Sequence, residues 1–264
     1  MPGNLLVFGL GYTARAFARR LGEDWKIAAT TRCEHGPELP PGGFAGVTHI
    51  LVSIPPGDTG DPVLARFGAE IAALDRRRWL GYLSTTGVYG TRNGGWVDEG
   101  SALLPSGPRG ARRIAAEQGW LGLGAHVFRL AGIYGPGRSA FDALRAGTAR
   151  RIDAGSQVFS RIHVDDIATV LSASIARPRP GAVYNVCDDE PAAQAEIVAH
   201  AARLLGREPP PLVPLAEAKL SAMARSFYAD DKRVSNALIK RELGVTLAYP
   251  NYRAGLAAIL VAGG

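Results

Sequence analysis

A glycine-rich turn between a short apolar strand and a helical stretch is the feature that most constrains the fold of this chain. Residues 5–8 form the expected strand, and the turn over residues 9–14 has the pattern Gly-x-Gly-x-x-Ala. In such a unit, Gly9 permits a tight turn, Gly11 lets the backbone approach a pyrophosphate, and Ala14 lets the helix pack closely on the sheet. The helix N-terminus offers free N–H groups and a positive dipole end to phosphates. The pattern therefore predicts a dinucleotide-binding site rather than a turn without a ligand.

The end of the second expected strand, residues 26–32, decides which dinucleotide would bind. An Asp or Glu there would hydrogen-bond the ribose 2′-hydroxyl and repel a 2′-phosphate. This chain has Thr30 or Thr31 at that position, followed by Arg32, whose guanidinium can hold a phosphate through two parallel hydrogen bonds. We therefore predict NADP(H) in preference to NAD(H). The alternative is that Arg32 is simply an exposed arginine.

Composition is typical of an ordinary folded enzyme-like protein. At 264 residues, with 47% hydrophobic and 20% charged residues, the chain can bury a large core. The net charge of +6 is spread along the whole chain, so it does not indicate nucleic-acid binding. The arginine run at 76–78 is interpreted as the end of a helix. No apolar run approaches the roughly 20 residues that span a bilayer.

The two cysteines, Cys33 and Cys187, lie far apart and have no metal-ligand spacing. No secretory signal peptide is recognisable at the N-terminus. We therefore expect a cytoplasmic protein without a metal site.

Strands and helices are predicted to alternate along the first part of the chain. Further strands are expected at 48–54, 79–83 and 126–130, and helices at 14–21, 62–77 and 110–121. This alternation predicts an α/β fold, a Rossmann-like doubly wound parallel sheet.

The chain becomes mixed after residue 140. Helices are predicted at 196–206, 215–225 and 231–243, around a proline-rich separator. These helices predict a small, mostly helical C-terminal substrate lobe. We expect residues 1–264 to form a single NAD(P)-binding Rossmann domain, with the lobe contributed by about 136–160 and 187–250.

Five motifs occur together in one order and spacing. They are the glycine turn and residues 84–90, 129–137, 162–168 and 184–186, which include Ser-Thr-Thr-Gly-Val-Tyr-Gly and Arg-Leu-Ala-Gly-Ile-Tyr-Gly-Pro-Gly. In these motifs the chain resembles the NAD(P)-dependent epimerase/dehydratase group of the extended short-chain dehydrogenase/reductases over nearly its whole length.

The resemblance implies that the Thr85 hydroxyl hydrogen-bonds the reacting oxygen of the substrate. The family's proton donor is a Tyr about twenty residues later, followed four residues on by a Lys that holds the nicotinamide ribose and lowers the tyrosine pKa. Carried onto this chain, these positions are Arg109 and Arg113, so the tyrosine is missing. A guanidinium cannot act as a general acid at neutral pH, although Arg113 can still hold the ribose. Alternatively, the two arginines bind a carboxylate or phosphate, or are solvated.

Other site residues are expected at the carboxyl ends of the strands. Thr85, Arg113 and Tyr89 are the catalytic candidates, with Tyr134 as a further proton donor to consider. For the cofactor we expect Gly9, Gly11, Tyr12, Thr13, Ala14, Thr31, Arg32, Ser53, Ile54, Pro55, Ser84, Arg113, Ala131, Gly132 and Ile133. For the substrate we expect Thr86, Arg109, Tyr134, Arg138 and Arg161, whose arginines suit a nucleotide-linked sugar or a carboxylate. Residues 226–228 are also expected to flank the substrate pocket.

Two functional hypotheses follow. The first is an NADP(H)-binding oxidoreductase or epimerase/dehydratase-like enzyme for a small, anionic or sugar-like substrate, whose proton donor is a neighbouring tyrosine, a water chain or the substrate itself. The second is a non-catalytic dinucleotide-binding redox sensor, which the replacement of Tyr and Lys by Arg favours. Apart from a small-molecule substrate, neither nucleic acid nor membrane is expected as a partner, and the chain is expected to be a monomer or a homodimer through helices 62–77 and 110–121.

Overall fold

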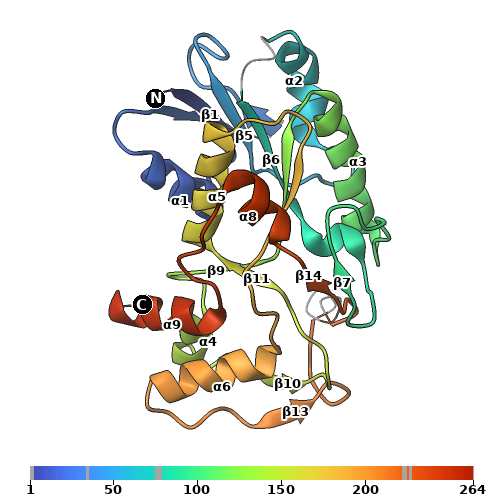
Figure 1. The fold of residues 1–264 in the computed structure, drawn as a ribbon, viewed down its shortest axis with the longest axis vertical. Coiled ribbons are helices and arrows are strands. Elements are labelled where there is room, and N and C mark those ends of the chain that lie inside the picture. Colours follow the sequence, from blue (N-terminus) through green and yellow to red (C-terminus); the bar gives the residue numbers. More distant parts are fainter. Residues whose placement is uncertain (1–2, 34–35, 75–78, 222–224, 226–227, 264) are drawn as a thin grey trace.

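A computed structural model of the chain describes residues 3–33, 36–74, 79–221, 225 and 228–263, without the side chains of Arg32 and Cys33 (Figure 1). Its centre is a parallel six-stranded sheet in the spatial order β12-β8-β6-β5-β1-β2. The strands are β1 (Asn4–Phe8), β2 (Lys26–Ala29), β5 (His49–Val52), β6 (Trp79–Thr85), β8 (His126–Leu130) and β12 (Val183–Val186).

The strand order reverses between β1 and β5. The chain passes from β1 to β2 at one edge of the sheet and then returns to add β5 on the other side of β1. In doubly wound sheets, ligands bind outside the carboxyl ends of the strands at such a reversal. The predicted Rossmann-like α/β fold is therefore confirmed.

Helices cover both faces of the sheet (Figure 1). The helices α1 (Tyr12–Leu21), α5 (Val164–Ala176) and α8 (Ala237–Leu243) cover one face, and α2 (Pro62–Ala72) and α3 (Pro108–Gly122) cover the other. Alternate residues of a strand point to opposite faces, so in β1 Leu5 and Val7 pack with the first group and Leu6 and Phe8 with the second. All four are almost fully buried, which explains why β1 is an unbroken apolar run.

The remaining elements lie at or beyond the carboxyl ends of the sheet. Four small strand pairs are β3 (Thr31–Cys33) with β4 (Gly36–Glu38), β7 (Trp96–Val97) with β14 (Arg233–Val234), β9 (Gly132–Tyr134) with β11 (Arg161–His163), and β10 (Arg151–Asp153) with β13 (Leu212–Pro214). A 3₁₀ turn, η1 (Thr86–Tyr89), follows β6.

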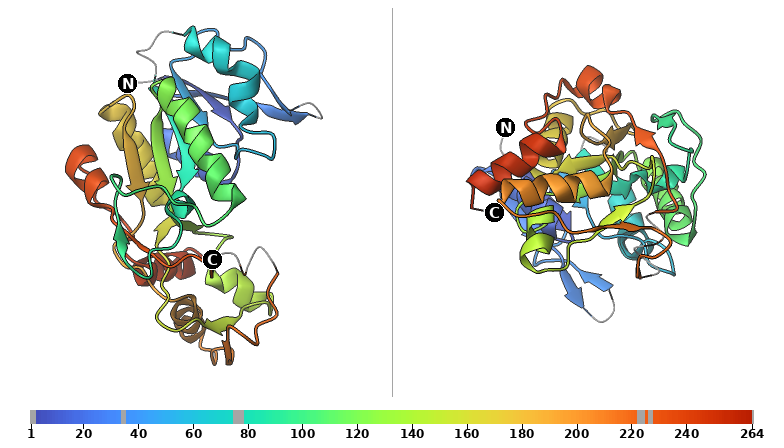
Figure 2. Two further views of the ribbon diagram at one scale, coloured as in Figure 1. Left: turned by 90° about the vertical axis from the view of Figure 1, so that its right-hand side faces the viewer. Right: turned by 90° about the horizontal axis from the view of Figure 1, so that it is seen from below.

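The helices α4 (Ala140–Arg145), α6 (Gln194–Leu204) and α9 (Tyr252–Val261) share a separate apolar core around Phe141, Ile197 and Leu256. We call these three helices, with β10 and β13, the C-terminal lobe. It lies beyond one end of the sheet in both Figure 1 and Figure 2.

Two helices predicted near the C-terminus are wrong over part of their length. Residues 215–217 form a turn after β13 and 218–221 are irregular, so the predicted helix 215–225 is wrong over 215–221; Arg225 is helical, and residues 222–224 lie outside the described part of the chain. In 231–243 the helix begins only at Ala237, because Arg233 and Val234 pair instead with β7. The predicted helix 62–77 ends at Ala72 within the described residues, and the arginine run at 76–78 lies outside them.

Within the described ranges, none of the helices combines the length and apolar character needed to cross a membrane. The same residues contain no group of His, Cys, Asp and Glu side chains that could hold a metal ion.

Candidate functional site

The glycine turn after β1 fits a dinucleotide pyrophosphate. Gly9 has φ +88°, and a Cβ there would lie 2.7 Å from the Cγ1 atom of Ile54, so the fold itself requires glycine. Gly11 has an ordinary φ of −84°, and a Cβ there would meet no protein atom within 4 Å. No side chain caps the first turn of α1, whose N–H groups are therefore free for an anion.

Neighbouring residues hold this turn in place. The Thr30 Oγ1 atom accepts the Gly9 N–H at 3.3 Å, and the Tyr12 hydroxyl donates to the carbonyl oxygen of Pro136 at 3.0 Å. Thr31 is exposed at the start of β3. The side chain of Arg32 lies outside the described part of the chain, so its contact with a 2′-phosphate stays a prediction.

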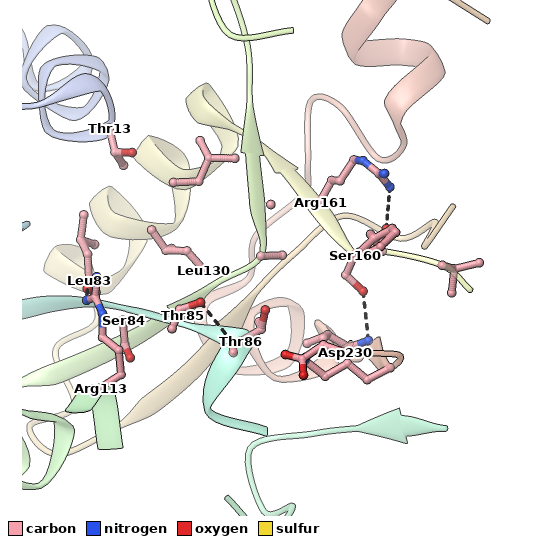
Figure 3. A pocket seen from close by; sticks show the side chains of 18 of the residues that line it. Thr13, Leu83, Ser84, Thr85, Thr86, Arg113, Leu130, Ser160, Arg161 and Asp230 are labelled. Carbon is pink, nitrogen blue, oxygen red and sulfur yellow. Dashed lines mark hydrogen bonds and ion pairs between the residues drawn. The ribbon is translucent and has the colours of Figure 1, made fainter. Parts of the chain in front are cut away.

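A cavity of about 670 Å³ lies at the carboxyl ends of β6 and β8 (Figure 3). Eleven of the residues predicted for the site line it, namely Thr13, Ser53, Ser84, Thr85, Thr86, Arg113, Ala131, Gly132, Ile133, Arg138 and Arg161. The cavity therefore brings together residues beside the glycine turn, residues after β6 and β8, and residues from the later half of the chain.

Thr85 ends β6 and caps the 3₁₀ turn that follows. Its Oγ1 atom accepts the Gly87 N–H at 3.1 Å, which leaves the Thr85 proton available to a substrate oxygen. The adjacent Ser84 hydroxyl is committed elsewhere, because it donates to Glu117 at 2.5 Å. Thr85 thus lines the cavity, and its contact with a substrate oxygen stays a prediction.

Of the two arginines expected at the family's Tyr and Lys positions, only Arg113 lines the cavity. Its Nη1 atom donates to the carbonyl oxygen of Leu83 at 2.7 Å and to the Tyr82 hydroxyl at 3.2 Å. Since α3 begins at Pro108, Arg109 lies in its first turn and is exposed. The prediction of Arg109 as a substrate contact beside Arg113 is therefore wrong in this arrangement.

Tyr89 is a structural residue. It is fully buried, its hydroxyl donates to the Asn185 Oδ1 atom at 2.7 Å, and it accepts from Arg129 Nη1 at 2.9 Å. Burial raises the pKa of Tyr89, which makes it a poorer acid. The prediction of Tyr89 as catalytic is wrong, because its hydroxyl belongs to a network behind the cavity wall.

Tyr134 lies outside the cavity as well. It is 8% exposed, its hydroxyl lies 3.4 Å from the carbonyl oxygen of Asn251, and its ring packs edge-on against His163. Burial raises the pKa of Tyr134 above its usual range. The predicted substrate contact of Tyr134 is wrong, because the ring instead packs into the core of the C-terminal lobe.

Arg161 places a buried positive charge on the cavity wall. Its Nη1 atom donates to the carbonyl oxygens of Phe159 at 2.6 Å and Ala192 at 2.8 Å, and its Nη2 atom donates to Gln194 Oε1 at 2.9 Å. Burial lowers the pKa of Arg161 to about 10. Its neutral partners leave the charge uncompensated by any direct hydrogen bond to a carboxylate in the described part of the chain.

Tyr228, from the segment 226–228 that was predicted to flank the substrate pocket, lines the cavity, while residues 226–227 lie outside the described part of the chain. Other lining residues were not predicted as site residues from the sequence, among them Ser160, Gln194, Asp230 and Lys232. The Lys232 ammonium lies 3.1 Å from Asp230 Oδ2. The sequence does hold a signal for Lys232. It follows Tyr228 by four residues, which is the family's spacing between the catalytic Tyr and Lys, although this segment is not helical here.

Known proteins show partial sequence similarity to this chain. No known protein-family profile matches it. It is 33% identical over 152 residues to the 3-diazoavenalumate denitrifying reductase of a Streptomyces species, and 28% identical over 174 residues to protein YeeZ of Escherichia coli K12. These matches cover 54% and 64% of this chain and 49% and 58% of the relatives. The chain thus spans about half the length of the curated relatives it matches.

Solved structures match over the whole chain. A conserved protein of unknown function from Silicibacter pomeroyi is 52% identical, with a TM-score of 0.92 over 98% of this chain and 99% of that one. The dTDP-glucose 4,6-dehydratase of Bacillus anthracis, solved with NAD, is 18% identical with a TM-score of 0.74 and coverage of 98% and 96%. Human epimerase family protein SDR39U1, solved with NADPH, is 17% identical with a TM-score of 0.74 and coverage of 97% and 98%.

These comparisons define the class of protein. The chain has the extended short-chain dehydrogenase/reductase fold of the NAD(P)-dependent epimerases and dehydratases, as the sequence motifs predicted. Within that class it belongs to one family with the Silicibacter pomeroyi protein.

Proposed function

We propose that this chain is an NADP(H)-dependent oxidoreductase that acts on the carbonyl or hydroxyl group of a small, anionic or sugar-like compound. The observation that carries the proposal is the cavity of about 670 Å³. Thr13 and Ser53 line this cavity beside the dinucleotide turn, and residues within 228–234 line it from the C-terminal part of the chain. A substrate in this cavity would lie next to a cofactor at the turn.

The cofactor proposal rests on the turn and on the end of β2. The N–H groups at the start of α1 would hold the pyrophosphate, and Thr13, Ser53 and residues 131–133 would line the path of the nicotinamide half. The lack of an Asp or Glu at residues 30–32, directly after β2, and the presence of Arg32 favour NADP(H). When bound, the nicotinamide supplies or accepts a hydride.

The proposed anionic substrate rests on the charges that line the cavity. Among the described residues these are Arg113, Arg138, Arg161 and Lys232 against one carboxylate, Asp230. Such an excess of cations attracts carboxylates and phosphates. The Streptomyces relative is named as a reductase, which agrees with reduction of a substrate.

A substrate pocket weighs against the alternative of a redox sensor, because a sensor needs to bind only the dinucleotide.

We further propose that the protein is cytoplasmic and acts as a monomer or as a homodimer through α2 and α3. Size-exclusion chromatography with light scattering would give the oligomeric state.

Calorimetric titration with NADPH, NADP⁺, NADH and NAD⁺ tests the cofactor. We expect tight binding of both NADP forms by the unaltered protein and a clear loss with Arg32→Ala, because the 2′-phosphate would lose its guanidinium partner. Arg207→Ala is the matched control, because Arg207 is an exposed arginine that follows α6 in the chain. Failure of all four dinucleotides to bind would contradict the proposal.

A screen for NADPH oxidation tests the reaction. The panel consists of aldehydes and ketones that carry a carboxylate or a phosphate, each beside its uncharged analogue. Turnover of the charged members, with weaker turnover of the analogues, would support the proposal. Strong preference for one redox form of NADP(H) without turnover would favour the sensor.

A further inference from the structure

We propose that Tyr228 is the proton donor of the cavity, in place of the tyrosine that the family carries on the helix corresponding to α3. This inference rests on the proposed oxidoreductase function. It assigns the acid to a segment more than a hundred residues further along the chain, and it explains how the site can work with Arg109 and Arg113 on α3.

Five of the other seven tyrosines make hydrogen bonds through their hydroxyls, and the remaining two, Tyr249 and Tyr252, do not line the cavity. The five that make these hydrogen bonds are Tyr12, Tyr82, Tyr89, Tyr134 and Tyr184. Tyr228 differs, because it lines the cavity with Thr85 and its hydroxyl has no hydrogen-bond partner among the described residues. A phenol that is free to bind a ligand is therefore present where the substrate would lie.

The backbone and ring of Tyr228 are held firmly at the cavity wall. The Gln157 side-chain Nε2 atom donates to the carbonyl oxygens of Tyr228 at 3.0 Å and Asp230 at 2.8 Å. The Tyr228 ring packs edge-on against Phe159 with centroids 5.5 Å apart, and Phe159 also lines the cavity. These contacts fix the residue before a ligand arrives, as proton transfer requires.

The charge beside Tyr228 is that of Arg161. Burial raises the pKa of Tyr228, and the Arg161 guanidinium opposes this by lowering it. A phenolate left after proton transfer would therefore face a fixed positive charge whose own hydrogen bonds go to neutral groups. In the family a lysine ammonium has this effect; here a buried arginine would supply it.

Lys232 is the other acid on the wall, and it is less suited to the role. Its ammonium lies 3.1 Å from Asp230 Oδ2, so a substrate oxygen would have to compete with that carboxylate for the ammonium. The serine and threonine hydroxyls of the cavity are weaker acids than a phenol. Among the described residues of this wall, Tyr228 thus offers a phenol proton that no neighbouring side chain engages.

The proposed step balances as a carbonyl reduction. The carbonyl carbon gains a hydride from the reduced nicotinamide dinucleotide, which is oxidised, and the π-bond electrons move to the oxygen. The oxygen, held by the Thr85 hydroxyl, takes the proton as the Tyr228 O–H bond breaks. The Tyr228 phenolate then recovers a proton from water. The reverse sequence oxidises the alcohol.

Nitration with tetranitromethane, read by peptide mass spectrometry, tests the position of Tyr228 without a substrate. We expect Tyr228 to be nitrated in the free protein and to lose most of this modification in saturating NADP⁺, because the nicotinamide half would cover it. Tyr249, which packs against His163 outside the cavity, should be unaffected by NADP⁺. Nitration of Tyr228 that NADP⁺ does not change would overturn the proposal.

Tyr228→Phe tests the proton transfer itself. We expect the rate of NADPH-dependent reduction to fall by about 10²- to 10⁴-fold, the usual contribution of a general acid, with unchanged NADPH affinity. The wild-type rate should fall as pH rises through the pKa of Tyr228, and any residual activity of the variant should lack that decline. Tyr249→Phe is the matched control and should behave as wild type.

The outcomes separate the two proposals. Failure of every dinucleotide to bind would end the proposed function and the role of Tyr228 together. Binding of NADP⁺ without protection of Tyr228, or wild-type reduction by Tyr228→Phe, would leave the function standing and overturn the proton donor. A variant that loses NADPH affinity along with activity would show a positioning role and would also overturn it.

Discussion

The buried ion pair between Glu117 and Arg129 fixes the residues behind the cavity. Arg129 Nη2 lies 2.8 Å from Glu117 Oε2, and the two side chains are only 5% and 2% exposed. The hydroxyls of Ser84 and Tyr89 join the same network. These hydrogen bonds compensate for taking two charges out of water, and they give the hydroxyls of Ser84 and Tyr89 a structural role.

Glu117→Gln should therefore be strongly destabilising. It leaves the Arg129 charge buried without a counter-charge, and we expect the free energy of unfolding to fall by about 3–5 kcal/mol. Urea denaturation measures this. Arg112→Ala is the control, because its partner Asp58 is 90% exposed and the pair should contribute about 0–1 kcal/mol. Equal losses in the two variants would contradict the argument.

Thr85→Ala tests the residue that would orient the reacting oxygen. Removing one hydrogen bond to a developing oxyanion lowers kcat by about 10²-fold, and we expect a loss of that order in NADPH-dependent reduction. Thr85→Ser keeps the hydroxyl and should restore most of the rate. Because the Thr85 oxygen also caps the Gly87 N–H, thermal unfolding of both variants is needed to separate the two roles. Full activity in Thr85→Ala would rule out the role.

Asp188 should make stability depend on pH. It is 1% exposed, and burial raises its pKa to about 8, against the opposing charge of Arg161. Since an unfolded Asp has a pKa of about 3.9, between about pH 4 and pH 8 the folded chain keeps a proton that the unfolded chain has lost. The free energy of unfolding should therefore fall as pH rises through this window.

Urea denaturation of Asp188→Asn across the same window checks this expectation. The variant lacks the titrating group, so its stability should fall less with pH than that of the wild type. Asp189→Asn is the control, because that carboxylate is 41% exposed and pairs with Lys240. Parallel pH profiles for the wild type and Asp188→Asn would show that the Asp188 proton is not linked to folding.

At the scale of elements, the sequence predicted the sheet well because its strands carry their own signal. The strand β1, for example, holds a run of four apolar residues buried on both faces, and a helix with apolar residues at helical spacing follows it. The region after β13 has no such local signal. There β14 forms because its backbone pairs with β7, more than a hundred residues earlier in the chain. Such a distant contact cannot be predicted from the strand or helix propensities of the residues in β14 itself.

The same contrast explains which site residues were predicted. Thr85 and Arg113 follow or face the ends of regular strands, where the motifs place ligand contacts. Asp230 and Lys232, which were not predicted, come from an irregular segment that reaches the cavity only through tertiary contacts such as the Val234 N–H to Ser160 Oγ hydrogen bond. Tyr89 and Tyr134 were wrong because a tyrosine in a motif gives no indication of whether its hydroxyl is buried.

Gly11→Ala separates ligand binding from folding at the start of α1. The backbone of Gly11 suits any residue, and an added Cβ meets no protein atom within 4 Å, so thermal stability should be unchanged. The methyl group would occupy space that a pyrophosphate needs, and NADPH affinity should fall about tenfold or more. Gly9→Ala is the comparison, because its positive φ and its clash with Ile54 should destabilise the fold. Unchanged NADPH affinity in Gly11→Ala would contradict the assigned phosphate site.

At the scale of the whole molecule, the cavity joins elements that meet only through tertiary contacts. Residues beside the glycine turn line it from the sheet, and the stretch around Tyr228 lines it from the other side. That stretch is tied to distant loops, since the Arg233 N–H donates to the carbonyl oxygen of Gly95 at 2.9 Å. A ligand that fills the cavity should therefore stabilise both sides at once.

Hydrogen exchange with bound NADPH tests this coupling. At about 100 times its Kd, a ligand that binds only the folded state raises the free energy of global unfolding by about 2.7 kcal/mol. Amides that exchange through local opening, rather than through global unfolding, report which segments the ligand orders. We expect slower local exchange at residues 9–14 and also at 158–161 and 228–234, since Thr13, Phe159 and Tyr228 all line the cavity. Local opening of α9, which the cavity does not touch, should be unaffected. Slowing confined to residues 9–14 would mean that the nicotinamide half does not reach the wall that carries Tyr228, and the site would then bind a dinucleotide without bringing it to a substrate.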